Sequence, residues 1–202
     1  MKVKLSAILV LGCMLFQASG ASPETVKQLN AMMQGEYATN HRYGAFAQKA
    51  TEEGLTPEAA LFRAAARAEG IHRSAMRAAM QTMNLEPSEP TPDDLKPAST
   101  RENLQTSILS ENAEAKVIYP RLLKQLGTET NSVQAIRIIE YAIASEAQHS
   151  RLFQEALAHL GENKTNAYYI CPQCSLLSLE KPSEACQNCQ GRANPILLRA
   201  PK

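Results

Sequence analysis

A chain of 202 residues with 44% hydrophobic content is long enough to bury one good core and to carry a small appendage. Its formal net charge is +1, so electrostatics give no case for a nucleic-acid partner. Four of the five cysteines come after residue 170, which predicts a separate module at that end of the chain.

The first residues are typical of a secretory signal peptide. Lys2 and Lys4 make a basic start, an apolar run covers residues 5–16, and small residues precede Ala21. The apolar run is too short to span a membrane permanently. We therefore expect residues 1–21 to be a signal peptide cleaved near Gly20 or Ala21, and the mature protein to be exported to the periplasm.

An alternative interpretation of the same segment is a lipoprotein processing site. Residues 10–13 would then be the recognition sequence and Cys13 would carry the lipid. Against this, the apolar run continues past Cys13 to Phe16, where a lipoprotein usually turns polar.

Periodicity and capping signals predict four long helices in residues 22–161, which we expect to form one bundle. Thr56 is the expected N-cap of the second helix, and Ser99 or Thr100 that of the third. The expected helices cover residues 23–53, 56–83, 100–126 and 132–160.

Between the second and third helices, residues 85–98 contain four prolines and cannot be helical throughout. Roughly 14 extended residues reach up to about 45 Å. A helix of 27 residues is about 40 Å long, so this linker can cross the whole bundle. Glu111 then lies 12 residues after Ser99, as Glu69 lies 12 residues after Pro57, at matching depth.

Each predicted helix has a glutamate within its apolar face. Two of them belong to Glu-x-x-His pairs, Glu69 with His72 and Glu146 with His149, whose i, i+3 spacing aims both side chains the same way. Buried carboxylates cost several kcal/mol unless cations neutralise them, and these faces hold no Lys or Arg. Metal ions are therefore the expected cations.

One Glu from each of two helices plus a Glu-x-x-His from each of the other two is the ligand set of carboxylate-bridged di-iron and di-manganese bundles. Ligand type favours iron or manganese without excluding zinc. The expected ligands are Glu36, Glu69, His72, Glu111, Glu146 and His149, with Glu114 one turn from Glu111.

Residues 162–202 contain two Cys-x-x-Cys pairs, Cys171 with Cys174 and Cys186 with Cys189. This pattern predicts a tetrahedral four-thiolate site, which accepts either iron or zinc. Because export leads to an oxidising compartment, disulfides are a further alternative.

The sequence resembles the rubrerythrin family over nearly all of the predicted mature chain. The resemblance rests on residues 35–38, 43–47, 62–65, 100–104 and 146–149, on Tyr119-Pro120, and on the cysteine pairs. It implies an all-α, ferritin-like four-helix bundle with a long crossover, followed by a small rubredoxin-like module. It also implies seven bundle ligands, including both Glu111 and Glu114, and places Tyr43 and Tyr119 close to the metal pair.

The resemblance implies a function as well. We expect a peroxide reductase of oxidative-stress defence that reduces hydrogen peroxide to water at two iron ions, with manganese as the alternative metal. Electrons would arrive from an unidentified donor through the four-cysteine iron, and Glu114 would change its hold on one metal with oxidation state. In the family, one subunit's cysteine module lies near the other subunit's bundle, so a homodimer or higher homo-oligomer is expected.

Two other functions fit the same residues. One is a ferroxidase or iron-handling protein, and the other is a metal-binding protein with a structural zinc knuckle. The sequence also departs from the family pattern, because Ser175 follows the second cysteine where glycine is usual, and the second pair lacks the usual proline after Cys186.

Overall fold

The computed structural model describes residues 21–91, 96–164, 167–182, 184–191 and 194–199. Residues 1–20 of the predicted signal peptide, with Cys13, lie outside these ranges. Among the described helices, none combines the length and the apolar character that crossing a membrane requires.

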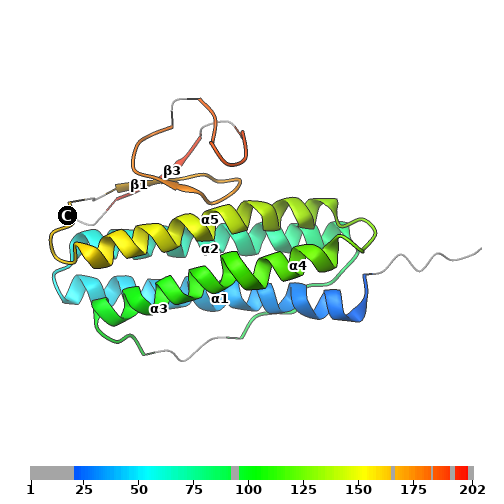
Figure 1. The fold of residues 1–202 in the computed structure, drawn as a ribbon, viewed down its shortest axis with the longest axis horizontal. Helices are drawn as coiled ribbons and strands as arrows, with labels where there is room; N and C mark the ends of the chain where they lie inside the picture. Colours follow the sequence, from blue (N-terminus) through cyan, green and yellow to red (C-terminus); the bar gives the residue numbers. More distant parts are fainter. Residues whose placement is uncertain (1–20, 92–95, 165–166, 183, 192–193, 200–202) are drawn as a thin grey trace, which may run out of the picture.

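Four rods of helix lie side by side, and a small sheet rests on one side of them (Figure 1). The third rod consists of three segments in series. The elements are α1 (Pro23–Glu52), α2 (Thr56–Thr82), α3 (Thr100–Ala113), η1 (Glu114–Ile118), α4 (Tyr119–Leu126), α5 (Val133–Ala158), β1 (Ala167–Ile170), β2 (Leu177–Ser178) and β3 (Ile196–Arg199). The four-helix bundle with a small cysteine module confirms the predicted fold class.

Local signals explain where α1 begins and ends. The Ser22 side chain accepts a hydrogen bond from the Thr25 amide, and Pro23 occupies the first turn, where its missing N–H costs nothing. Gly54 follows the helix with φ +76°, a conformation that glycine adopts without strain. The prediction for α2 was wrong by one residue, because Leu55 occupies the N-cap position and no side chain caps that helix.

The proline-rich linker runs along the outside of α1 to the opposite end of the bundle (Figure 1). Asn30 accepts a hydrogen bond from the Ser88 amide at 2.8 Å, and Gln34 exchanges two with the Thr91 backbone at 2.9 Å. These side chains satisfy backbone groups that have no helical partner. The described first part of the crossover is therefore fixed on α1 at Ser88 and Thr91.

A capping box starts α3 at the depth that the sequence predicts. The Ser99 side chain accepts from the Glu102 amide, and the Glu102 carboxylate accepts from the Ser99 amide at 3.1 Å. The expected single helix from residue 100 to 126 is interrupted, however, by a π-turn at η1. There the Tyr119 amide donates to the Glu114 carbonyl.

This π-turn explains how Pro120 is tolerated. A proline inside an α-helix removes one backbone hydrogen bond and clashes with the preceding turn. Here the π-turn ends at Ile118, so Pro120 stands in the first turn of α4, where no N–H is required. π-turns of this kind occur frequently at functional sites.

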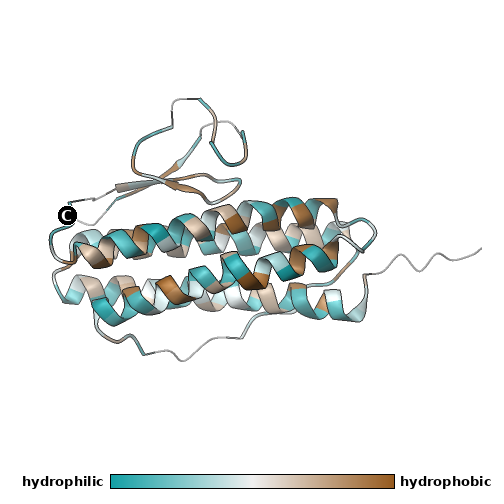
Figure 2. Ribbon diagram, viewed as in Figure 1, coloured by the Kyte–Doolittle hydropathy of each residue, from teal (hydrophilic) through white to brown (hydrophobic). Residues whose placement is uncertain are grey.

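The core has an aromatic end and a methionine-rich end. Teal and brown alternate along every helix, as expected when one face is buried (Figure 2). At one end, Tyr43, Phe46, Phe62 and Phe153 pack with ring centroids 5.3–6.2 Å apart. At the other end lie Met32, Met33, Met76, Met80 and Met83. On each rod the predicted ligands fall between these two clusters.

Replacing Ser99 by Ala should destabilise the protein by about 1 kcal/mol, because it removes one half of the capping box. In a domain of this size that lowers the midpoint of thermal unfolding by roughly 2–4 °C. Calorimetry of the purified variant measures the shift. Thr106→Ala, an exposed change within the same helix, is the control and should not lower the midpoint. An unchanged midpoint for Ser99→Ala would show that the capping box does not contribute to the stability of α3.

Candidate metal centre

The four helical rods bring together the six predicted ligands other than Glu114. Each is at most 2% exposed, and they come from α1, α2, α3 and α5. Their carboxylate and imidazole atoms form two groups in which every ligand atom lies within 4.8 Å of the others. The first group is Glu36, Glu69, His72 and Glu146, and the second is Glu69, Glu111, Glu146 and His149.

Glu69 and Glu146 belong to both groups, and each of them aims one oxygen at each histidine. Glu146 Oε1 lies 2.8 Å from His72 Nδ1, while its Oε2 lies 2.9 Å from His149 Nδ1. Glu69 Oε2 lies 3.2 Å from His72 Nδ1, and its Oε1 lies 3.4 Å from His149 Nδ1. If two cations were bound beside the histidines, Glu69 and Glu146 would each have one oxygen to offer to each of them.

The two remaining carboxylates are each held by a tyrosine. Tyr119 donates its hydroxyl proton to Glu36 Oε1, and Glu36 Oε2 faces His72 Nδ1 at 3.7 Å. Tyr43 donates to Glu111 Oε1, and Glu111 Oε2 faces His149 Nδ1 at 3.5 Å. Because each tyrosine occupies one oxygen, Glu36 and Glu111 each present a single oxygen to the centre. The structure thus places both predicted tyrosines beside the site.

Glu114 lies at the edge of the cluster rather than in either group of four. It is the first residue of η1 and is partly buried. Its Oε2 atom is buried and has no hydrogen-bond partner among the described residues. Burial, reinforced by the charge of Glu111, raises the pKa of the Glu114 carboxyl well above its usual range.

The donor set fits two divalent cations. Several buried ligand atoms lack a hydrogen bond within the described part of the chain, among them Glu69 Oε1, Glu111 Oε2, both oxygens of Glu146, and His149 Nδ1. Buried polar groups are normally paired, so a concentration of unpaired oxygens and nitrogens around one point indicates ligands to ions. Two ions of charge +2 nearly balance five carboxylates.

Without ions, the cluster must bind protons. Burial raises the pKa of the Glu36 carboxyl to about 8, and burial together with Glu146 raises the pKa of Glu111. Burial opposes a charge on the histidines, yet the facing carboxylates together, Glu146 foremost, outweigh it and raise the pKa of both His72 and His149. The two facing histidines in turn outweigh burial at Glu146 and lower its pKa.

Outside the ligands, two serines contact the histidine rings on the side away from the carboxylates. Ser145 Oγ lies 3.2 Å from His149 Nε2, and Ser175 Oγ contacts His72 Nε2. The i, i+4 spacing of Ser145 and His149 on one helix could have indicated the first contact. Nothing in the local sequence could have indicated the second, because it joins residues 103 positions apart.

The four cysteines form the second candidate metal site. All four thiols are free, and their sulfur atoms lie within 4.8 Å of one another. Cys174 Sγ is 3.4 Å from Cys186 Sγ, and Cys171 Sγ is 3.7 Å from Cys189 Sγ. A tetrahedron with metal–sulfur bonds of about 2.3 Å has sulfur–sulfur edges of about 3.8 Å. The spacing therefore suits one metal ion, and the cysteines are not disulfide-bonded in this structure.

The two cysteine pairs have the same backbone geometry. The residue after the second cysteine, Ser175 in one pair and Gln190 in the other, has φ of +59° and +58°. Each donates its amide to the carbonyl of the first cysteine at 2.9 Å. A left-handed conformation costs a non-glycine residue roughly 1–2 kcal/mol, so the sequence keeps a side chain at both positions at some cost in stability.

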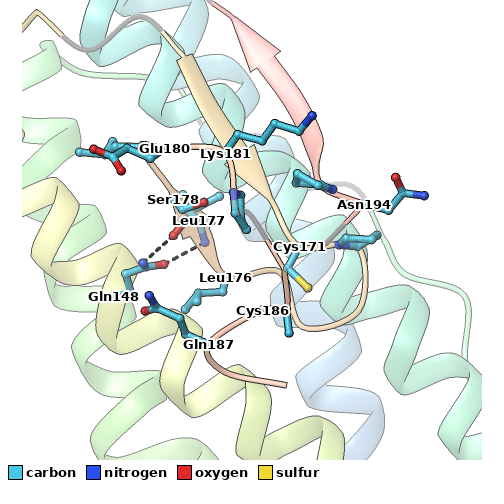
Figure 3. A pocket seen from close by; sticks show the side chains of 15 residues that line it. Gln148, Cys171, Leu176, Leu177, Ser178, Glu180, Lys181, Cys186, Gln187 and Asn194 are labelled. Carbon is cyan, nitrogen blue, oxygen red and sulfur yellow. Dashed lines mark hydrogen bonds between the residues drawn. The ribbon is translucent and has the colours of Figure 1, made fainter. Parts of the chain in front are cut away.

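Several polar contacts hold the cysteine module on the bundle of the same chain. Gln148 on α5 exchanges hydrogen bonds with the Leu177 backbone at 2.6 and 2.9 Å, as Figure 3 shows. Asn188 donates to the Tyr141 carbonyl at 3.2 Å, and Ser175 contacts His72. Beside Gln148 lies a cavity of about 540 Å³ whose lining includes Cys171 and Cys186 (Figure 3).

Comparison with known proteins agrees with this geometry. The rubrerythrin family model matches residues 27–158. Nigerythrin from Nitratidesulfovibrio vulgaris is 27% identical over 176 residues, which is 87% of each chain. Rubrerythrin-2 from Clostridium acetobutylicum is 28% identical over 168 residues, 82% of this chain and 91% of that protein.

Solved structures give the same result. Fully reduced nigerythrin matches with a TM-score of 0.78 at 26% identity, over 96% of this chain and 98% of that one. A bacterioferritin from Mycobacterium tuberculosis has a TM-score of 0.61 over 71% of this chain and 91% of that one, and at 18% identity it shares the fold alone.

Fold and site together define a ferritin-like carboxylate bundle joined to a four-thiolate module. The matching nigerythrin structure is of an all-ferrous state. The chain belongs to the rubrerythrin family, whose members are di-iron oxidoreductases.

The metal-free bundle should lose stability as pH rises from 5 to 8. Glu36 has a pKa of about 8 when folded and 4.5 as its ordinary value, so in this range the folded state binds more protons than the unfolded state. The raised pKa values of His72 and His149 act in the same direction above 6.5. The lowered pKa values of Glu69 and Glu146 act only below 4.5.

Thermal unfolding of protein that carries zinc only at the cysteines would measure this slope. Glu36→Gln should make it shallower, because the amide cannot ionise, while the exposed control Glu140→Gln should not change it. Added Mn²⁺ should reverse the slope, because metal binds the deprotonated ligands. A midpoint that rises with pH in the metal-free bundle would contradict the assignment.

Proposed function

We propose that this protein reduces hydrogen peroxide to water at a two-iron centre in the bundle. The observation that carries the proposal is that Glu69 and Glu146 each direct one oxygen to each histidine. Two ions sharing these carboxylates would lie side by side and would act on one small substrate. The family membership of the chain and its second, thiolate site support redox chemistry over simple metal storage.

The residues divide into ligands of one ion, ligands of the other, and shared ligands. His72 and Glu36 would hold the first ion, and His149 and Glu111 the second. Glu69 and Glu146 would bridge them. Glu114 would be the ligand that changes with oxidation state, because it lies outside both groups yet keeps a buried oxygen without a partner among the described residues.

Peroxide reduction requires two electrons and two protons, and it yields two waters. The bound ferrous pair would supply one electron per ion. The protein excludes bulk water from the site, because the six proposed ligands other than Glu114 are buried. Burial also raises the pKa of Tyr43 and of Tyr119, so each hydroxyl keeps its proton one hydrogen bond away from a ligand carboxylate. In this proposal the tyrosines hold protons at the site.

Electron supply would run through an iron ion held by Cys171, Cys174, Cys186 and Cys189. The module rests on α2 and α5, which carry the two Glu-x-x-His pairs. The donor that reduces it is unidentified. Because the sequence begins with a predicted signal peptide, this donor would be a protein or small carrier of the periplasm rather than cytoplasmic NADH.

The mature protein would comprise a bundle over residues 22–161 and a rubredoxin-like module over residues 162–202, released from the leader in the periplasm. It would form a homodimer or a higher homo-oligomer. Manganese in the bundle and zinc at the cysteines are the competing metals, and they would leave the chain without an internal electron relay.

Anaerobically purified mature protein should contain about three iron ions per chain, two in the bundle and one at the thiolates. Elemental analysis measures this directly. Cys186→Ser should remove about one of the three and the strong visible absorption of an iron–thiolate centre. Two irons with one zinc would leave the bundle chemistry intact and contradict the electron relay.

Reduced protein mixed with peroxide in a stopped-flow instrument should oxidise faster than reduced protein mixed with oxygen. Glu114→Gln should slow the reaction with peroxide roughly 10- to 100-fold, as expected for a residue that tunes a metal site. Its thermal unfolding should change little, and Glu140→Gln, an exposed helical glutamate, should match the unaltered protein in both measurements.

The reaction with oxygen decides between the two enzymatic functions. If oxygen reacts faster than peroxide, the protein is a ferroxidase or iron-handling protein, and the proposal fails. If Glu114→Gln loses stability in proportion to rate, its effect is structural and the assigned role fails.

A further inference from the structure

Ser175 is one of the buried points at which the cysteine module meets the bundle. It follows Cys174 directly and is 0% exposed. Its hydroxyl contacts His72 Nε2, lies 2.6 Å from the Cys174 carbonyl oxygen, and lies 3.2 Å from Ser145 Oγ. The hydroxyl can accept a hydrogen bond from the imidazole N–H while it donates one to the carbonyl or to Ser145.

The same contacts reach the second histidine. Ser145 Oγ lies 3.2 Å from His149 Nε2, so two hydroxyls in series connect the outer nitrogens of both rings. Both histidines turn Nδ1 towards the carboxylates. Nε2 is therefore the nitrogen that can form a hydrogen bond to a group outside the metal site. Such hydrogen bonds fix the tautomer and the orientation of a metal-binding imidazole.

The backbone shows that the side chain at position 175 is not required by the cysteine pair itself. Gln190 occupies the equivalent place in the other pair, with the same positive φ and the same amide bond, but its side chain is exposed. Glycine would satisfy this conformation without strain. A strained residue whose hydroxyl reaches the site is an observation from which function can be inferred.

We propose that Ser175 is a positioning residue through which docking of the cysteine module sets the orientation of both ligand histidines. The inference rests on the proposed two-metal centre. Its consequence is coupling: metal binding in the bundle favours the docked module, and docking favours metal binding by the same factor. One hydroxyl would thus make the two metal sites of the chain depend on each other.

The test compares Ser175→Gly with Gln190→Gly. Both relieve the same backbone strain, and only the first removes the hydroxyl that contacts His72. Full-length mature protein is given one equivalent of Zn²⁺, which the thiolates take first, and is then titrated with Mn²⁺, which prefers carboxylate and imidazole ligands. Electron paramagnetic resonance of free Mn²⁺ gives the dissociation constant of the bundle.

Ser175→Gly should weaken Mn²⁺ binding by roughly 10- to 100-fold, the usual effect of losing an outer partner of a ligand. Its midpoint of thermal unfolding should be equal to or above that of the unaltered protein, because glycine relieves the strain. Gln190→Gly should bind Mn²⁺ as the unaltered protein does. Ser175→Ala, which keeps the strain and lacks the hydroxyl, should lose affinity as the glycine variant does.

Hydrogen exchange provides a readout that simple packing would not change. In the unaltered protein, Mn²⁺ should slow exchange of the Leu177 amide, which is bonded to Gln148 at the docking surface. In Ser175→Gly, Mn²⁺ should have little effect on that amide. Equal Mn²⁺ affinity in Ser175→Gly and the unaltered protein would overturn this inference alone. Failure of the unaltered protein to bind Mn²⁺ in the bundle would overturn the metal centre itself.

Discussion

The structure depends on the burial of like charges in the middle of a helical bundle. Four fully buried glutamates approach one another closely enough to be ligands of common ions, and Glu114 adds a fifth carboxylate at the edge. Two histidines cannot balance this charge, so the metal-free cluster must take up protons and the loaded cluster must hold cations. The aromatic and methionine ends of the core supply the apolar packing on either side of this layer of buried carboxylates.

The surrounding chain is arranged so that this layer is assembled accurately. The crossover fixed on α1 lets α3 begin at the end where α2 begins, and the capping box sets its first residue. Tyr43 and Tyr119 each occupy one carboxylate oxygen and leave the other towards the centre. The π-turn that accommodates Pro120 begins at Glu114, three residues after Glu111. These features place ligands rather than simply stabilise helices.

The cysteine module is an extension of the same site. Its contacts fall on α5 at Tyr141 and Gln148 and on α2 at His72, between and beside the ligand pairs. Ser175, one of the two departures from the family pattern, is also the residue of the module that contacts His72. In the proposed arrangement, this side chain links the two centres.

The sequence by itself determined the four helices, the crossover, the six inward-facing Glu and His side chains and the grouping of the four cysteines, because each depends on spacing within one helix or one loop. Only the tertiary structure decided which carboxylates face both histidines, that Glu114 lies at the edge, where the π-turn falls, and what Ser175 touches. These depend on distances between side chains from different helices, set by the rotation and depth of each rod. Periodicity fixes the face of a helix, whereas packing fixes which atoms of the opposing faces meet.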